Sequence, residues 1–307
     1  NGKAKAIIVN SVNANTCNAD GVQKAEKMCS LVADEMGLNV DDVIVASTGV
    51  IGQILPIEPI ANGMKELVSG LTYDGNSRAV EAIMTTDTQV KEVAVQFELG
   101  GKTCTMGGML KGSGMIHPNM ATTLTFITTD VDISAELLQK ALSDVVKITL
   151  NRVSVDGDTS TNDMVCVLAN GTAENIPVTK ENQDFEKFVN ALYAVMMNLA
   201  RKMARDGEGA TKLIECVCHG ADDDKTAEIV AKSVITSSLF KAAMFGEDAN
   251  WGRILCAVGY ADADFDINKV DVSISSDKGS IDVCKNGAGV EFSEELAKEI
   301  LKEEEII

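Results

Sequence analysis

The chain has 307 residues, of which 45% are hydrophobic and 24% are charged, a mixture typical of folded globular proteins. This length allows one large domain or two ordinary ones. Acidic residues number 46 and basic residues 27, which gives a formal net charge of −19; together with only 4% aromatic residues, this argues against binding to nucleic acid or to an anionic membrane.

Strand and helix patterns alternate along the chain, which predicts an α/β or α+β fold with long helices packed on sheets. In chain order we expect a strand at 4–9, a helix at 21–36, a strand at 43–46, a hairpin of 92–98 and 102–106, a strand at 124–127, helices at 134–148 and 183–204, strands at 212–218, 270–274 and 280–283, and a helix at 293–302. Gly37 stands where a C-terminal helix cap belongs, and Ser134 is the expected N-cap of its helix.

The eight cysteines are scattered, mostly inside apolar segments, and a chain of this length needs no disulfide framework. No apolar run is long enough to cross a bilayer, and no secretory signal is visible. We therefore expect reduced core cysteines in a cytosolic or organellar protein, with the cytoplasm as the expected location.

Three familiar signals are weak here. Gly101-Lys102-Thr103 looks like part of a phosphate-binding loop, but Gln96 stands where that motif needs glycine, so a hairpin turn is the better prediction. Cys216, Cys218 and His219 suggest a metal site, but alternation within a strand explains the cysteines equally well and zinc needs three or four ligands, so no metal is expected. The chain has two histidines, which makes a Ser-His-Asp triad a weak prediction, and we do not expect the catalytic base to be histidine.

Four polar, glycine-rich segments interrupt the apolar pattern, at residues 47–52, 111–124, 154–163 and 205–212. The first follows a predicted strand, so its backbone N–H groups could bind an anion or an oxyanion, although an ordinary strand-to-helix turn explains it as well.

Thr122 stands in the second segment, at the head of a predicted strand and after a small residue. If the peptide bond before it breaks, its hydroxyl gains an α-amino group as a built-in base, and such an amine titrates at roughly 7.7–8.0. Threonine is also common in strands for packing reasons alone, so this observation by itself leaves the nucleophile open.

The stretch 111–130 (KGSGMIHPNMATTLTFITTD) resembles the autoprocessing segment of the bifunctional ornithine acetyltransferases, also called glutamate N-acetyltransferases. Further stretches resemble the same family in the same order along nearly the whole chain: 9–15, 46–52, 85–88, 151–163, 206–212 and 245–253.

This resemblance implies a layered fold similar to the N-terminal-nucleophile hydrolases and a precursor that cuts itself between Ala121 and Thr122. It implies two pieces, 1–121 and 122–307, that stay together, and association of two such processed pairs into a heterotetramer. The implied reaction is a ping-pong transfer of the acetyl group from N2-acetyl-L-ornithine through an acetyl-Thr122 enzyme to L-glutamate. No cofactor is expected, and whether acetyl-CoA also serves as a donor stays open.

The resemblance also assigns roles to single residues. Thr122 is the implied nucleophile, and Thr48 and Gly49 match the pair that stabilises the oxyanion. Thr85, Lys111, Thr122 and Glu208 match positions that contact the substrate. Glu208 suits a substrate ammonium and Lys111 suits the α-carboxylate that ornithine and glutamate share; outside this family context, both would be read as solvated surface charges.

The chain departs from the family pattern in two ways. Position 123 is threonine where the family more often has methionine, and family members usually extend further at both ends. We therefore expect the family's N-terminal strands, and a C-terminal segment that closes over the substrate, to be missing here. Two alternatives stay open: a self-processing amidohydrolase or aminopeptidase that transfers its acyl group to water, and a catalytically silent homologue.

Overall fold

The computed structural model describes residues 2–117 and 123–307, and the chain divides into two compact units. The first comprises Asn1–Val153 and Asp158–Glu208, and the second comprises Ser154–Gly157 and Gly209–Ile307.

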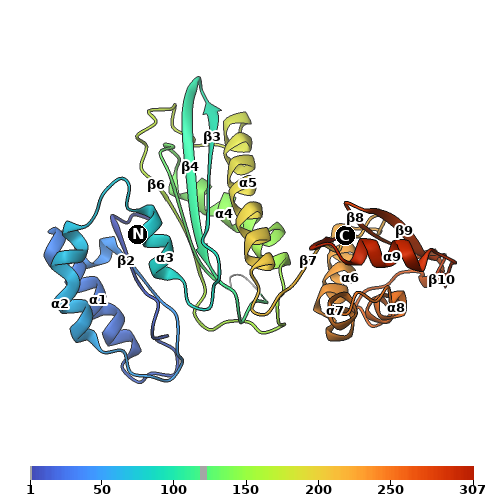
Figure 1. The fold of residues 1–307 in the computed structure, drawn as a ribbon. Coiled ribbons are helices and arrows are strands. Elements are labelled where there is room, and N and C mark those ends of the chain that lie inside the picture. Colours follow the sequence, from blue (N-terminus) through green and yellow to red (C-terminus); the bar gives the residue numbers. More distant parts are fainter. Residues whose placement is uncertain (1, 118–122) are drawn as a thin grey trace. The chain divides into compact units, whose positions relative to one another are not determined.

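One side of the first unit consists of two parallel strands covered by helices (Figure 1). Its elements are β1 (Ala6–Asn10), α1 (Gly21–Met36), β2 (Val43–Ser47), α2 (Ile57–Ser69) and α3 (Asn76–Ile83). Ile8 of β1 and Val43 of β2 share a core with Met28 of α1 and Met64 of α2. Gly37 ends α1 in the left-handed conformation, with φ of 66°, so the predicted cap is confirmed.

The other side of the first unit is a four-stranded sheet in the order β3-β4-β5-β6. Its strands are β3 (Lys91–Leu99), β4 (Lys102–Lys111), β5 (Leu124–Thr129) and β6 (Met164–Ala169), with only the β5–β6 pair parallel. Two helices, α4 (Ala135–Ile148) and the long α5 (Gln183–Arg205), pack on one face (Figure 1). Gly108 allows this close approach, because a Cβ atom there would lie 2.9 Å from Cγ1 of Val195.

The opposite face of this sheet packs on β1 and β2. Leu124 and Phe126 of β5 share a cluster with Ala46 of β2 and Ile83 of α3. The first unit is therefore layered as helices, two-stranded sheet, four-stranded sheet and helices, which confirms the predicted architecture. The loop that follows β2 and Lys111, the last residue of β4, both lie in this unit.

The second unit packs helices against a three-stranded antiparallel sheet. Its elements are β7 (Leu213–Ile214), α6 (Asp224–Thr236), α7 (Ser238–Phe245), α8 (Trp251–Gly259), β8 (Val272–Ser276), β9 (Gly279–Lys285), β10 (Ala288–Gly289), α9 (Glu294–Leu301) and β11 (Glu305–Ile306). β11 pairs in parallel with β7 and joins the end of the unit to its beginning.

The structure confirms some of the sequence predictions and corrects others. Strands β3 and β4 form the predicted hairpin, so Gly101-Lys102-Thr103 lies at its turn. The prediction of a strand at 212–218 is wrong beyond Ile214, because the partner strand β11 has only two residues with which β7 can pair. All eight cysteines are free, but Cys17 and Cys256 are exposed, so they are not core residues. Within residues 2–117 and 123–307, no helix has the length and apolar character needed to cross a bilayer.

Candidate active site

The loop after β2 is held against the chain that follows β1. The backbone N–H of Thr48 donates to the carbonyl of Asn10 at 2.8 Å, and that of Val50 donates to the carbonyl of Val12 at 2.9 Å. Between them, Gly49 adopts φ of 119°, and a Cβ atom there would lie 2.2 Å from the Val12 carbonyl oxygen. Only glycine fits this position, and the hydrogen bonds of Thr48 and Val50 hold the chain on either side of it.

Two donors of this loop are available for a ligand. Among the described residues, neither the Thr48 hydroxyl nor the Gly49 N–H has a hydrogen-bond partner. The Thr48 N–H is already used by Asn10, so the hydroxyl is the free donor of that residue. A hydroxyl and an N–H group on adjacent residues of one loop are the kind of donors that stabilise an oxyanion.

Lys111 is the last residue of β4 and is buried, with 8% of its surface exposed. Its ammonium makes no hydrogen bond or ion pair within the described ranges. Burial lowers the pKa of Lys111, Asp87 and Asp163 act in the opposite direction, and Lys91 adds to the lowering. A buried ammonium without a direct partner is costly, and an anionic ligand would offset that cost.

Asp163 stands beside the start of β5. It precedes β6, where the Met164 N–H donates to the Thr123 carbonyl at 2.8 Å. Burial raises the pKa of Asp163 to about 7, against the opposing effects of the Ser160 hydroxyl and of Lys111. A carboxyl group with this pKa exchanges protons near neutral pH.

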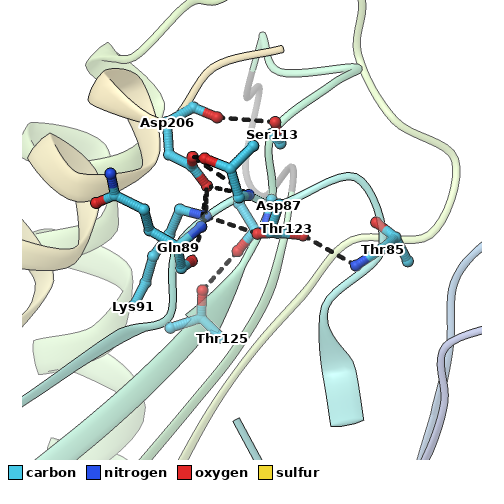
Figure 2. A network of polar contacts seen from close by, with 10 residues as sticks. Thr85, Asp87, Gln89, Lys91, Ser113, Thr123, Thr125 and Asp206 are labelled. Atoms are coloured by element: carbon cyan, nitrogen blue, oxygen red, sulfur yellow. Dashed lines mark hydrogen bonds and ion pairs between the residues drawn. The ribbon is translucent and has the colours of Figure 1, made fainter. Parts of the chain in front are cut away.

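Lys91, Asp87 and Asp206 form a buried charge network (Figure 2). The Nζ atom of Lys91 lies 2.7 Å from Oδ1 of Asp87 and 2.5 Å from Oδ2 of Asp206. The side chains of all three residues are at most 5% exposed. Burial alone would raise the pKa of each carboxyl, but hydrogen bonds from Lys91 and from nearby backbone N–H groups outweigh it and lower both pKa values.

The network connects the three described positions that were expected to contact the substrate. Oδ2 of Asp87 accepts the Thr85 N–H at 3.0 Å, and its Oδ1 accepts the N–H of Gly112, the residue after Lys111, at 2.7 Å. Glu208 follows the end of α5, and its N–H donates to the Ser113 carbonyl at 2.9 Å. Among the described residues, the Glu208 carboxylate has no ion-pair partner.

Hydrogen bonds connect the loop after β2 to Asn162, the residue before Asp163. Asn162 accepts a hydrogen bond from the Thr16 hydroxyl at 2.6 Å, and its own amide donates to the Asn15 side chain. Thr16 in turn accepts the N–H of Gly52 at 3.3 Å. The chain segments that carry the Thr48 and Asp163 positions are thus linked through direct contacts in one unit.

Two predicted residues, Ala121 and Thr122, lie outside the described residues, so cleavage between them and the nucleophile remain predictions. The next residue, Thr123, is buried and shares a hydrogen bond of 2.6 Å with the Thr125 hydroxyl. Sequence reasoning missed the roles of Asp87, Lys91 and Asp206, although the segments 85–88 and 206–212 had been singled out. In the part of the chain that the structure describes, no three His, Cys, Asp or Glu side chains are grouped to hold a metal.

Comparison with known proteins points in one direction. The model of the ArgJ family matches residues 1–307. The arginine biosynthesis bifunctional protein ArgJ of Caldanaerobacter subterraneus is 50% identical to this chain, over 99% of this chain and 76% of its own length. The arginine biosynthesis bifunctional protein ArgJ 1 of Clostridium acetobutylicum is 49% identical, over 98% of this chain and 74% of its own length. The crystal structure of the arginine biosynthesis bifunctional protein ArgJ from Bacillus halodurans is similar with a TM-score of 0.55 and 47% identity, over 59% of this chain and 84% of that one.

Proposed function

The chain belongs to the ArgJ family, and from this premise we propose that it transfers the acetyl group of N2-acetyl-L-ornithine to L-glutamate in arginine biosynthesis. The observation that carries the proposal is Lys111, a buried ammonium with no hydrogen bond or ion pair among the described residues. An α-carboxylate, which ornithine and glutamate share, is the ligand that this ammonium lacks. Glu208, with no ion-pair partner in the described chain, suits the δ-ammonium of ornithine.

The first half of the reaction releases ornithine. After cleavage, the Thr122 hydroxyl attacks the acetyl carbonyl while its own α-amino group takes the hydroxyl proton. The oxygen of the tetrahedral intermediate becomes negative, and the Thr48 hydroxyl and Gly49 N–H donate to it. The carbon–nitrogen bond then breaks, the proton passes to the leaving amine, and the acetyl group stays on Thr122 as an ester.

The second half regenerates the enzyme. Glutamate enters with its α-carboxylate on Lys111, and its neutral α-amine attacks the acetyl ester through a second oxyanion in the same loop. The Thr122 oxygen leaves and regains its proton. No cofactor takes part, and one site serves both amino acids in turn because both present the same α-carboxylate.

Product analysis tests the proposal. The chain is incubated with N2-[¹³C-acetyl]ornithine and glutamate, and mass spectrometry follows ornithine, N-acetylglutamate and acetate. We expect labelled N-acetylglutamate in equal amount to ornithine; labelled acetate in its place would identify the hydrolase alternative. Deuterated ornithine should exchange into acetylornithine without glutamate, because a ping-pong cycle needs no second substrate for its first half. Replacing acetylornithine with acetyl-CoA decides whether the thioester is also a donor.

The assembly and the compartment belong to the same proposal. The pieces 1–121 and 122–307 remain in one folded pair, and two pairs form a heterotetramer, as the family resemblance implies. Light scattering of the purified protein, followed by a denaturing gel of the same peak, tests both statements. We place the protein in the cytoplasm because its proposed substrates are free amino acids, and cell fractionation tests this placement.

A further inference from the structure

The chemistry proposed above leaves three buried charges unused. Among the described residues, Lys91, Asp87 and Asp206 make no hydrogen bond or ion pair with the loop of residues 47–52, yet their side chains are almost fully buried (Figure 2). Replacing a buried ion cluster with neutral groups is often harmless to stability, so such a cluster is weak evidence for a purely stabilising role. Its contacts suggest another one.

Asp87 holds the chain next to two substrate-contacting positions. One oxygen accepts the N–H of Thr85, and the other accepts the N–H of Gly112 while it also binds Lys91. The two segments come from different places in the sequence, before β3 and after β4. A single carboxylate therefore holds the backbone at Thr85 and the backbone that follows Lys111.

Asp206 holds the backbone next to Glu208, the third position that is expected to contact the substrate. Its carboxylate accepts the N–H and the hydroxyl of Thr88, and its carbonyl accepts the Ser113 hydroxyl at 2.8 Å. The Ser113 carbonyl in turn accepts the N–H of Glu208. The Asp206 backbone and side chain thus set where the Glu208 backbone begins relative to the loop that follows Lys111.

Lys91 joins these two carboxylates into one unit. Without it, two anions would face each other in a buried space, and one of them would have to move or take up a proton. The cluster as it stands carries one net negative charge, and Asp87 also favours the charged form of Lys111. Through Asp87 and Asp206, this single cation is connected to the backbone at Thr85 and at Gly112 beside Lys111, and to Ser113, whose carbonyl accepts the Glu208 N–H.

We propose that Lys91 is a positioning residue for acetyl transfer. By bridging Asp87 and Asp206, it holds Lys111 and Glu208 at the spacing needed to bind the α-carboxylate and the δ-ammonium of N2-acetylornithine. This inference rests on the proposed function and deepens it. Lys91 itself touches no substrate, so its effect is on which substrates are selected, through Lys111 for the carboxylate and through Glu208 for the ammonium.

Two substrate analogues separate this role from a merely structural one. N-Acetylputrescine lacks the α-carboxylate, and N-acetyl-L-norvaline lacks the δ-ammonium. The ratio of kcat/KM values for N2-acetylornithine and each analogue does not depend on how much of a preparation is folded. We expect the wild type to prefer N2-acetylornithine over either analogue by roughly 100-fold or more, since each analogue leaves a charged group of the site without its partner.

In Lys91→Met, both preferences should fall together to less than about tenfold, because Lys111 and Glu208 both lose the positions from which they bind the substrate. Lys111→Met should lose only the preference over N-acetylputrescine, and Glu208→Gln only that over N-acetyl-L-norvaline. The triple variant Lys91→Met/Asp87→Asn/Asp206→Asn removes all three charges, so it avoids an uncompensated buried charge if Lys91→Met alone does not fold. It should lose both preferences as well. Lys187→Met, which removes an exposed lysine of α5, is the matched control and should keep both.

The outcomes are distinct. Loss of both preferences in a folded Lys91 variant supports the inference, and so does their partial recovery in Lys91→Arg. Wild-type preferences in Lys91→Met or in the folded triple variant would overturn it while leaving the proposed function intact. A wild-type chain that transfers no acetyl group from N2-acetylornithine would overturn the proposed function, and this inference with it.

Discussion

The carboxylate of Glu208 lies directly over Gly114: a Cβ atom built on Gly114 would stand 2.1 Å from Oε2 of Glu208. The backbone of Gly114 is outside the left-handed region, so an alanine there would be conformationally allowed. The absence of a side chain at position 114 is therefore what lets Glu208 occupy its place.

Gly114→Ala should displace the Glu208 carboxylate without unfolding the protein, because the clashing atom is the far end of a flexible side chain. We expect KM for N2-acetylornithine to rise roughly tenfold with kcat little changed, since a charge partner of the bound substrate moves away. Steady-state kinetics and a thermal melt test this. Gly63→Ala in α2, where an added Cβ meets nothing within 4 Å, is the matched control. A fall in kcat with unchanged KM would contradict the assigned role of Glu208.

Processing gives the second prediction. Thr122→Ala should abolish both self-cleavage and acetyl transfer, because it removes the hydroxyl that acts in each step. Thr122→Ser should retain part of both. A denaturing gel with N-terminal sequencing should show pieces 1–121 and 122–307 in the wild type and one band in Thr122→Ala. Thr123→Ala, which changes the neighbouring hydroxyl, should still be cleaved. Transfer by an uncut Thr122→Ala chain would exclude Thr122 as the acetyl carrier.

Much of the fold could be predicted because local signals agree with the packing. The helix at 21–36 begins and ends as expected, and the Ser134 hydroxyl accepts the Leu137 N–H as an N-cap should. The segment 212–218 shows the limit of such signals. Alternation of apolar and polar residues predicts a strand, but a strand forms only where a partner backbone lies beside it. The partner here, β11, is two residues long, so β7 is equally short.

The site could be predicted only in part. Family motifs singled out Thr48, Lys111 and Glu208, which carry recognisable chemistry in polar segments. Lys91 gave no such signal, because a lysine at the start of an amphipathic strand looks like a solvated charge. Its burial follows from two carboxylates that reach it from four and 115 residues away, and the second of these distances cannot be read from a local pattern.

Asp163 gives a prediction about pH and stability. Burial raises its pKa from an ordinary 3.8 to about 7, so the folded protein binds its proton more tightly than the unfolded chain does. The resulting stabilisation is fully present below about pH 4 and is lost as pH rises through about 7, and the difference amounts to at most about 4 kcal/mol. In Asp163→Asn this downward slope of stability should disappear, as measured by denaturant unfolding from pH 4 to 8. Asp144→Asn is the control: the pKa of Asp144 is lowered by Lys140, so this carboxyl titrates below the measured range and its loss should leave the downward slope in place. An unchanged slope in Asp163→Asn would show that this carboxyl does not titrate in the window.

The oxyanion loop gives the last prediction, which separates binding from chemistry. The Thr48 N–H is committed to the Asn10 carbonyl, so the Thr48 hydroxyl is the donor that a substrate oxygen can use. That donor matters most when the oxygen becomes negative, so its loss should appear in the rate constant and hardly in substrate affinity. We expect Thr48→Ala to lower kcat by roughly 10²–10³-fold with little change in KM, the usual scale for one lost donor. Thr48→Ser keeps a hydroxyl at the same place and should retain most of the activity. Steady-state kinetics at saturating glutamate measures both variants. A rise in KM with an intact kcat in Thr48→Ala would mean that this hydroxyl binds the ground state and does not stabilise the oxyanion.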